Sequence, residues 1–137
     1  MIYPLRALLS WEKATKDRVA DIVDCIHASP KPEDMSNPIV KWTSRQLTFW
    51  RNAEQPAFME LTIEYQPNEL IADAYSLNTY VWCWRNIRIA PEELIKVIRE
   101  QFCNIINPVS YKITMRESGS MMAHDVCLIS KSDNWRD

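Results

Sequence analysis

Glycine is almost absent from this sequence: of its 137 residues, one, Gly119, is a glycine. Loops that hold phosphate groups through backbone N–H groups need several glycines at fixed spacings, because the backbone must turn tightly and approach the ligand closely. The sequence therefore excludes the P-loop and the dinucleotide-binding turn, together with the nucleotide-binding proteins that are built on these motifs.

Long apolar runs and a charge imbalance are missing as well. No run approaches the roughly 20 apolar residues of a membrane-spanning helix, and residues 1–9 hold too short an apolar segment for a secretory signal. The net charge at pH 7 is −2, and the basic residues are scattered, so they form no patch for nucleic acid. We therefore expect a cytoplasmic protein that has neither a membrane nor nucleic acid among its partners.

Cysteine and histidine are sparse, with four and two residues respectively. Without a secretory signal, the cysteines are expected to be free thiols. Cys25 and His27 are two residues apart on an expected helix, so their side chains project about 200° apart. His124 and Cys127 are three residues apart on an expected strand and face opposite sides of it. Neither pair converges on one ion, and the sequence predicts no metal site.

The sequence does contain enough apolar residues for one buried core. Hydrophobic residues make up 47% of the chain and include six tryptophans, and a chain of this length normally folds as one domain. Helical spacing predicts an N-terminal helix over residues 11–28, followed by a Pro-rich linker over residues 29–38. We expect a single domain over residues 1–137, in which residues 1–38 precede a core over residues 39–131.

The periodicity of the core changes from two residues to 3.6 and back to two. Residues 58–65 alternate strictly between apolar and polar side chains, which is typical of a half-buried antiparallel strand. In residues 39–50 the alternation loses phase near Ser44–Leu47, which predicts a bulge. The order β-β-α-α-β-β predicts an α+β fold: an antiparallel sheet with two helices on one face, plus the extra N-terminal helix. The expected strands are 39–50, 58–65, 110–116 and 121–130, and the expected helices are 74–84 and 91–107.

Several short motifs follow one another in the middle of the chain. They are Ile63-Glu64-Tyr65-x-Pro67, Asp73-x-x-Ser76-Leu77-x-x-Tyr80, Arg85-Asn86 and Glu92. Their order and spacing resemble the tunnelling-fold superfamily, and within it the single-module 7-cyano-7-deazaguanine reductases, which convert a nitrile to an amine in the queuosine pathway. The resemblance covers roughly residues 42–116. It implies a tunnelling fold, which assembles into homo-oligomeric barrels with sites between subunits.

The resemblance implies that the ligand anchor is retained. Glu92 matches the glutamate that pairs with the guanidine edge of a purine-like base, and Asp73 replaces a second binding acid, with Ala74 and Ser76 beside it. A carboxylate that accepts two N–H bonds from such a base gives bidentate, charge-assisted recognition. The other interpretation is structural: Glu92 can stabilise the start of its helix, and Asp73 can be a helix N-cap.

The same resemblance implies that the catalytic residues are missing. In the family, a cysteine thiolate attacks the nitrile and an aspartate supplies protons, and these positions fall on Trp50 and Ala57. No cysteine lies between Cys25 and Cys83. A nitrile needs a strong nucleophile, and tryptophan is not one. We therefore expect no catalytic residue of the family kind and no standard reductase activity.

The expected helix over residues 74–84 carries no charged residue. The family's two lysines that meet the cofactor phosphates fall here on Tyr75 and Asn78, so we expect no NADPH and no other cofactor. A helix without charge on any side requires burial all round, which predicts a homo-oligomer that uses this helix or the sheet edges. Tyr75, Thr79 and Trp82 form the face that we expect at such an interface.

Three functions remain open. The first is a protein that binds a purine-, pterin- or 7-deazaguanine-type heterocycle at a subunit interface and lacks standard nitrile reductase activity. The second is an enzyme of 7-deazaguanine metabolism with a displaced nucleophile, for which Cys83 is the nearby thiol. The third is a structural or interaction protein with a degenerate site. The sequence does not decide whether the protein is an enzyme, and we favour the first function.

Overall fold

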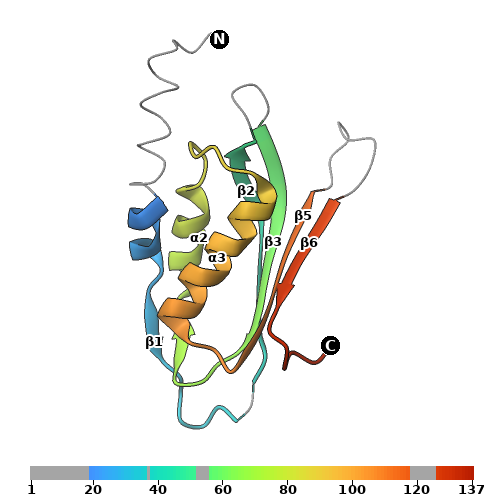
Figure 1. Cartoon of the computed structure of the whole chain (residues 1–137). Coiled ribbons are helices and arrows are strands. Elements are labelled where there is room, and N and C mark those ends of the chain that lie inside the picture. The colour runs from blue at the N-terminus through green and yellow to red at the C-terminus, as the bar shows by residue number, and fades with distance from the viewer. Residues whose placement is uncertain (1–18, 37, 52–55, 118–125) are drawn as a thin grey trace.

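A four-stranded antiparallel sheet forms the centre of the protein in the computed structural model, which describes residues 19–36, 38–51, 56–117 and 126–137 (Figure 1). The strand order is β2-β3-β5-β6, and neighbouring strands are antiparallel. This is the sheet that the alternating apolar pattern predicts. The strands are β2 (Val40–Trp50), β3 (Pro56–Gln66), β5 (Ser110–Glu117) and β6 (Val126–Lys131).

β3 supplies the middle of the buried face. Its alternation places Leu61, Ile63 and Tyr65 against the helices, where each is almost completely buried. The ring of Tyr65 meets that of Phe102 edge to face, with 5.0 Å between the ring centroids. This geometry is the favourable one for two aromatic rings and fixes the helix layer against the sheet.

The predicted bulge in β2 is confirmed. Ser44 pairs with Leu61 and Leu47 pairs with Met59, so β2 holds one residue more than the facing part of β3. The N–H of Gln46, in the bulge, donates to Ser44 Oγ at 3.2 Å. The extra residue explains why the sequence alternation changes phase at this point.

Two antiparallel helices cover one face of the sheet (Figure 1). They are α2 (Ala74–Trp82) and α3 (Pro91–Ile106). α3 ends as expected at Asn107, whose φ of 50° is left-handed and whose N–H donates to the Cys103 carbonyl at 2.9 Å. None of the helices in the described residues is long and apolar enough to cross a membrane.

α2 ends two residues before the expected end of its helix. The N–H groups of Trp84 and Arg85 donate to carbonyls three residues back, on Val81 and Trp82, at 3.2 and 3.3 Å. These tighter turns bring the chain round and bury the Trp84 ring completely. Apolar periodicity alone does not distinguish such a turn from one more turn of helix.

The N-terminal segment differs from the expected helix. Residues 19–22 are helical, but the chain then tightens into a 3-10 turn, η1 (Val23–Cys25), and the helix stops before its expected end. β1 (Ala28–Pro30) pairs antiparallel with β4 (Leu70–Ala72), and the sequence predicted neither strand. Pairing with a distant segment overrides the local pattern and ties the expected linker to the core. The expected helix start, at residue 11, lies outside the described residues.

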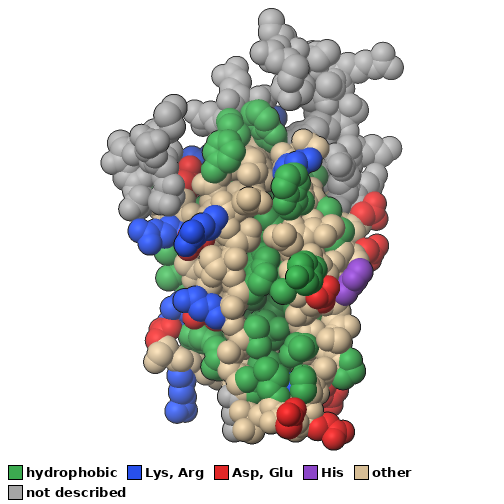
Figure 2. All heavy atoms as spheres, turned by 180° about the vertical axis from the view of Figure 1, so that it is seen from behind, with side chains coloured by type: hydrophobic (Ala, Val, Ile, Leu, Met, Phe, Trp, Pro, Cys, Tyr) green, Lys and Arg blue, Asp and Glu red, His purple; other side chains and the backbone are tan. Residues whose placement is uncertain are grey.

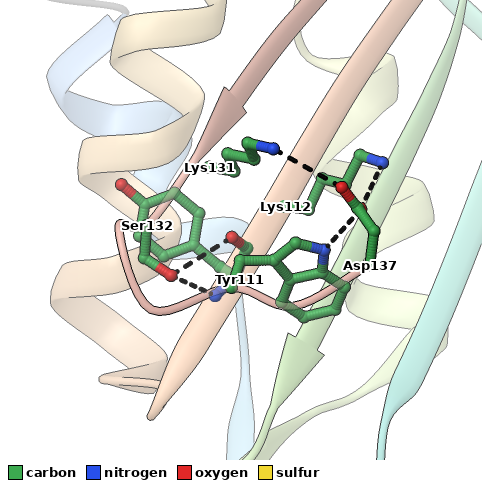
Figure 3. Close-up of polar contacts among 6 residues, drawn as sticks. Tyr111, Lys112, Lys131, Ser132 and Asp137 are labelled. Atoms are coloured by element: carbon green, nitrogen blue, oxygen red, sulfur yellow. Dashed lines mark hydrogen bonds and ion pairs between the residues drawn. The ribbon is translucent and has the colours of Figure 1, made fainter.

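The segment after β6 folds back along the start of β5 (Figure 3). The N–H of Ser132 donates to the Tyr111 carbonyl and the N–H of Tyr111 donates to Ser132 Oγ, both at 3.0 Å. Asp137 accepts hydrogen bonds from Lys112 Nζ at 2.9 Å and from the Trp135 indole at 3.0 Å. The Lys112 and Trp135 hydrogen bonds lower the pKa of Asp137 to about 2.

Candidate functional site

Asp73 is the N-cap of α2. Its Oδ2 accepts a hydrogen bond from the Ser76 N–H at 3.2 Å, which satisfies one of the N–H groups left free at the start of a helix. The hydroxyl of Ser76 donates to the Asp73 carbonyl at 2.7 Å and accepts from the His27 N–H at 3.0 Å. Ser76 is buried, whereas Asp73 and Ala74 are exposed. Ser76 therefore fastens the N-terminal segment to α2, and Asp73 and Ala74 face solvent beside it.

Glu92 lies in the first turn of α3 and is exposed. Pro91 occupies the first position of the helix, where its fixed φ is helical and its missing N–H costs no hydrogen bond. The positive end of the helix dipole favours a carboxylate at this place. Glu93 stands beside Glu92 in the same turn and is also exposed. Glu92 can thus accept hydrogen bonds from a ligand without first losing a buried partner.

The structure does not bring Asp73 and Glu92 together within one chain. α2 and α3 run antiparallel, so their N-termini lie at opposite ends of the helix pair (Figure 1). α2 alone has nine residues, or about 13 Å at 1.5 Å per residue. A single small heterocycle cannot span that distance. If both carboxylates contact one ligand, they must come from two copies of the chain.

Trp50 lies at the same end of the molecule as the start of α3. Its N–H donates to the Ile87 carbonyl and its carbonyl accepts from the Ile89 N–H, both at 2.9 Å. The end of β2 therefore holds the segment that leads into Glu92. Trp50 pairs with Pro56, next to Ala57, which is completely buried. The positions that the resemblance assigns to the thiolate and the proton donor lie next to each other here, but neither residue has a nucleophilic or acidic group.

A buried ion pair closes the same end of the sheet, and the sequence interpretation missed it. Arg51 directly follows β2, Glu117 is the last residue of β5, and their side chains form an ion pair. The Glu117 side chain is 9% exposed and that of Arg51 is 25% exposed. The signal was present in the sequence, because Glu117 is in phase with Ile113 and Met115 on the buried face of β5.

Exposed aromatic side chains lie on the outer side of α2, whose own residues carry no charge. Tyr75 is 83% exposed and Trp82 is 47% exposed, and the guanidinium of Arg85 lies over the Trp82 ring, 4.1 Å from its centroid. Figure 2 shows a band of apolar side chains on the face turned away from the viewer of Figure 1. Asn78 is exposed on the same helix. Among the described residues, no group of three or more His, Cys, Asp or Glu side chains is placed to hold a metal ion.

Comparison with known proteins finds relatives of the central part of this chain. Residues 56–117 match the family described as QueF-like protein. The chain is also 37% identical over 60 residues to the NADPH-dependent 7-cyano-7-deazaguanine reductase of Syntrophus aciditrophicus (strain SB). Residues 56–117, somewhat less than half of the chain, are thus QueF-like. The match to that reductase covers 44% of this chain and 43% of the reductase, so the chain spans less than half of its length.

The fold agrees with that of a solved QueF-like protein. The crystal structure of the archaeosine synthase QueF-Like in the apo form matches with a TM-score of 0.64 at 20% sequence identity. It covers 74% of this chain and all of the solved chain. At this identity the likeness concerns the fold. The predicted antiparallel sheet with helices on one face is thereby confirmed as a tunnelling fold.

The QueF-like match includes the candidate ligand-binding residues but not the position assigned to the nucleophile. Residues 56–117 include Asp73, Ala74, Ser76 and Glu92, the candidate ligand-binding residues. The match begins after Trp50, the position that the resemblance assigns to the nucleophile. The part of the chain that is QueF-like is therefore the part that carries the candidate anchor.

Proposed function

We propose that this QueF-like chain binds a purine-, pterin- or 7-deazaguanine-type heterocycle through Glu92, at an interface between copies of the chain, and does not reduce nitriles with NADPH. The observation that carries the proposal is the exposed Glu92 carboxylate in the first turn of α3, inside the QueF-like match. Its two oxygens suit the two neighbouring N–H donors of an aminopyrimidinone ring, and charge assistance strengthens both hydrogen bonds.

The positions of the two acids support a site between copies. Asp73 caps the start of α2 and Glu92 lies in the first turn of α3, and the starts of these two antiparallel helices lie at opposite ends of the pair (Figure 1). One chain therefore presents half of a site at each end. The exposed Tyr75 and Trp82 side chains lie on α2 between these ends. A second copy that covers this apolar surface would bring its own acid toward the first copy. Such assembly also removes the cost of exposing large apolar side chains.

The replacement of the catalytic positions supports the absence of reductase activity. Trp50 and the buried Ala57 supply neither a thiolate nor a proton donor. The positions that the resemblance assigns to the two phosphate-binding lysines hold Tyr75 and Asn78, and neither side chain carries a positive charge. Binding without reduction is therefore the function that these residues support best.

The displaced-nucleophile alternative depends on Cys83. The sulfur of Cys83 lies 3.4 Å from that of Cys25, a second thiol. A cysteine nucleophile needs a base or a positive charge that stabilises its thiolate. A thiol partner provides neither, so this alternative has less support than binding alone. A structural protein with a degenerate site remains an outcome of the experiment below.

Isothermal titration calorimetry of the full chain with guanine, pterin and 7-deazaguanine tests the proposal, and adenine serves as a ligand that lacks the amino-ketone edge. We expect at least one of the three to bind and adenine not to bind. Glu92→Gln replaces a carboxylate oxygen with an amide donor and should cost about 2–4 kcal/mol, or roughly 30- to 1000-fold in affinity. Glu93→Gln is the matched control, because Glu93 is exposed in the same turn.

If the wild type and Glu92→Gln bind the heterocycles with equal affinity, Glu92 does not contact the ligand and only stabilises the start of its helix. Failure of the wild type to bind any of the heterocycles would favour the structural protein. Turnover of 7-cyano-7-deazaguanine with NADPH, measured as loss of NADPH absorbance, would contradict the catalytic half of the proposal.

A further inference from the structure

Two thiols meet where the N-terminal segment packs against the helix layer. The Sγ atoms of Cys25 and Cys83 are 3.4 Å apart, although the residues are 58 positions apart in the sequence. Cys25 is the last residue of η1, and Cys83 is the C-cap of α2. Both side chains are half-buried. The contact therefore joins an element that precedes the sheet to one that follows its first two strands.

Hydrogen bonds on both sides of Cys25 hold this contact in place. On one side, Gln101 Nε2 donates to the Val19 carbonyl at 2.7 Å. On the other, the His27 N–H donates to Ser76 Oγ at 3.0 Å. The N-terminal segment is thus attached to α3 before Cys25 and to α2 after it. These attachments bring the two cysteines together where the N-terminal segment packs against the helices.

We propose that Cys25 and Cys83 form a reversible thiol–disulfide pair that locks the N-terminal segment onto the end of α2 under oxidising conditions. The sulfurs would need to move roughly 1.4 Å closer to reach the S–S bond length of about 2.05 Å. The side chains of the other two cysteines do not share this contact, since Cys103 is on α3 and Cys127 is exposed on β6.

The oxidant is a low-molecular-weight disulfide such as oxidised glutathione. One cysteine, as its thiolate, attacks a sulfur of the oxidant, breaks its S–S bond and releases one thiolate. The second cysteine then loses its proton and attacks the first cysteine's sulfur, which forms the protein disulfide and releases the second thiolate. Two electrons pass from the protein to the oxidant, and the two protons end on the two released thiols.

The surroundings of Cys25 slow its reaction with such an oxidant. Burial and the neighbouring Cys83 raise the pKa of the Cys25 thiol to about 11. At neutral pH this thiol is therefore protonated and a weak nucleophile. We expect slow oxidation over minutes to hours, in keeping with the usual times of uncatalysed disulfide chemistry.

Oxidation of the full chain with oxidised glutathione tests the proposal. Non-reducing peptide mapping by mass spectrometry should find residues 25 and 83 in one cross-linked peptide, with two of the four thiols lost and no bound glutathione. The midpoint of thermal unfolding should rise on the order of 10 °C, because the bond closes a long loop, and dithiothreitol should reverse the shift. Cys25→Ser and Cys83→Ser should each abolish the cross-link and the shift, whereas Cys103→Ser and Cys127→Ser should keep both.

Several results would overturn the proposal. They are four free thiols after oxidation, stable glutathione adducts on Cys25 or Cys83 without a cross-link, or a cross-link that involves Cys103, Cys127 or a second chain. If a serine variant fails to fold, the peptide map of the wild type still decides, because it needs no substitution. Heterocycle binding is not part of this inference, so neither outcome bears on the proposed function.

Discussion

The carboxylate of Glu117, at the end of β5, is paired with the guanidinium of Arg51, which follows β2. β3 lies between these two strands, so the pair closes the end of the sheet across its central strand. Removal of one partner leaves the other charge largely buried and unpaired, which strongly destabilises the folded state. Replacement of both partners by well-packed apolar residues costs much less stability.

Arg51→Met should destabilise the fold by about 2–3 kcal/mol, somewhat less than the 3–5 kcal/mol of a fully buried pair because water reaches part of Arg51. Urea unfolding measures the change. The double variant Arg51→Met with Glu117→Leu should recover part of the loss. Arg45→Met is the matched control: Arg45 pairs with Glu60 at 3.6 Å but is 85% exposed, so its loss should cost less than about 1 kcal/mol. An equal cost at both sites would show that the Arg51 pair behaves as a surface pair.

Tyr80→Phe should destabilise the fold by about 1–2 kcal/mol, because the fully buried Tyr80 hydroxyl donates to Gln101 Oε1 at 2.6 Å. Gln101 in turn holds the Val19 carbonyl, so amide exchange of residues 19–26 should speed up as well. Thermal unfolding and hydrogen exchange check the two effects. Tyr75→Phe, at an exposed position of the same helix, should change neither. Unchanged exchange in Tyr80→Phe would mean that this network does not anchor the N-terminal segment.

The order of the main elements could be predicted from the sequence because it follows from the local spacing of apolar residues. A signal within a few residues indicates the alternation of β3, the phase change at Ser44 and the end of α3 at Asn107. β1 and β4 leave none, since each is three residues long and exists through pairing with the other. A strand that depends on a partner 42 residues away has no local signal.

The candidate site could be predicted in part for the same reason. The N-cap role of Asp73 and the position of Glu92 at a helix start follow from local rules, and the structure agrees with both. That these acids lie at opposite ends of the helix pair follows from the direction of α3 relative to α2, which periodicity does not specify. The neighbourhood of Trp50 and the segment before Glu92 is likewise set by long-range backbone bonds.

The C-terminal segment should respond to acid. The pKa of Asp137 is lowered to about 2, first by the Lys112 hydrogen bond and then by that of Trp135 (Figure 3). A group whose pKa is lower in the folded state stabilises that state above its unfolded pKa of 3.8 and loses the contribution as pH falls toward 2. The Trp135 indole N–H resonance of the folded protein should therefore shift with a midpoint near pH 2. Asp137→Asn should abolish this transition and Asp133→Asn should keep it; a transition near pH 4 would mean that Lys112 does not hold Asp137 in solution.

The apolar outer face of α2 should drive assembly of the chain. Light scattering behind size exclusion should give a homo-oligomer at micromolar concentration. Tyr75→Glu together with Trp82→Glu should lower the mass toward that of a monomer, because two charges then replace apolar contact surface. Lys96→Glu is the control, as Lys96 is exposed on α3. A wild-type monomer would contradict the interface, and an oligomer that survives the double substitution would move the contact to the free edges of β2 or β6.

A ligand site that takes Asp73 from one copy and Glu92 from another should allow complementation between inactive variants. Asp73→Asn and Glu92→Gln should each weaken heterocycle binding alone. After the two proteins are unfolded together and refolded as a mixture, half of the interfaces in a random two-fold dimer join different variants, and each mixed dimer has one intact site. About a quarter of all sites should then bind with wild-type affinity in a calorimetric titration. Separately refolded and then combined variants that do not exchange serve as the control. Absence of the tight-binding fraction, with mixed oligomers present by native mass spectrometry, would show that the two acids do not serve one site.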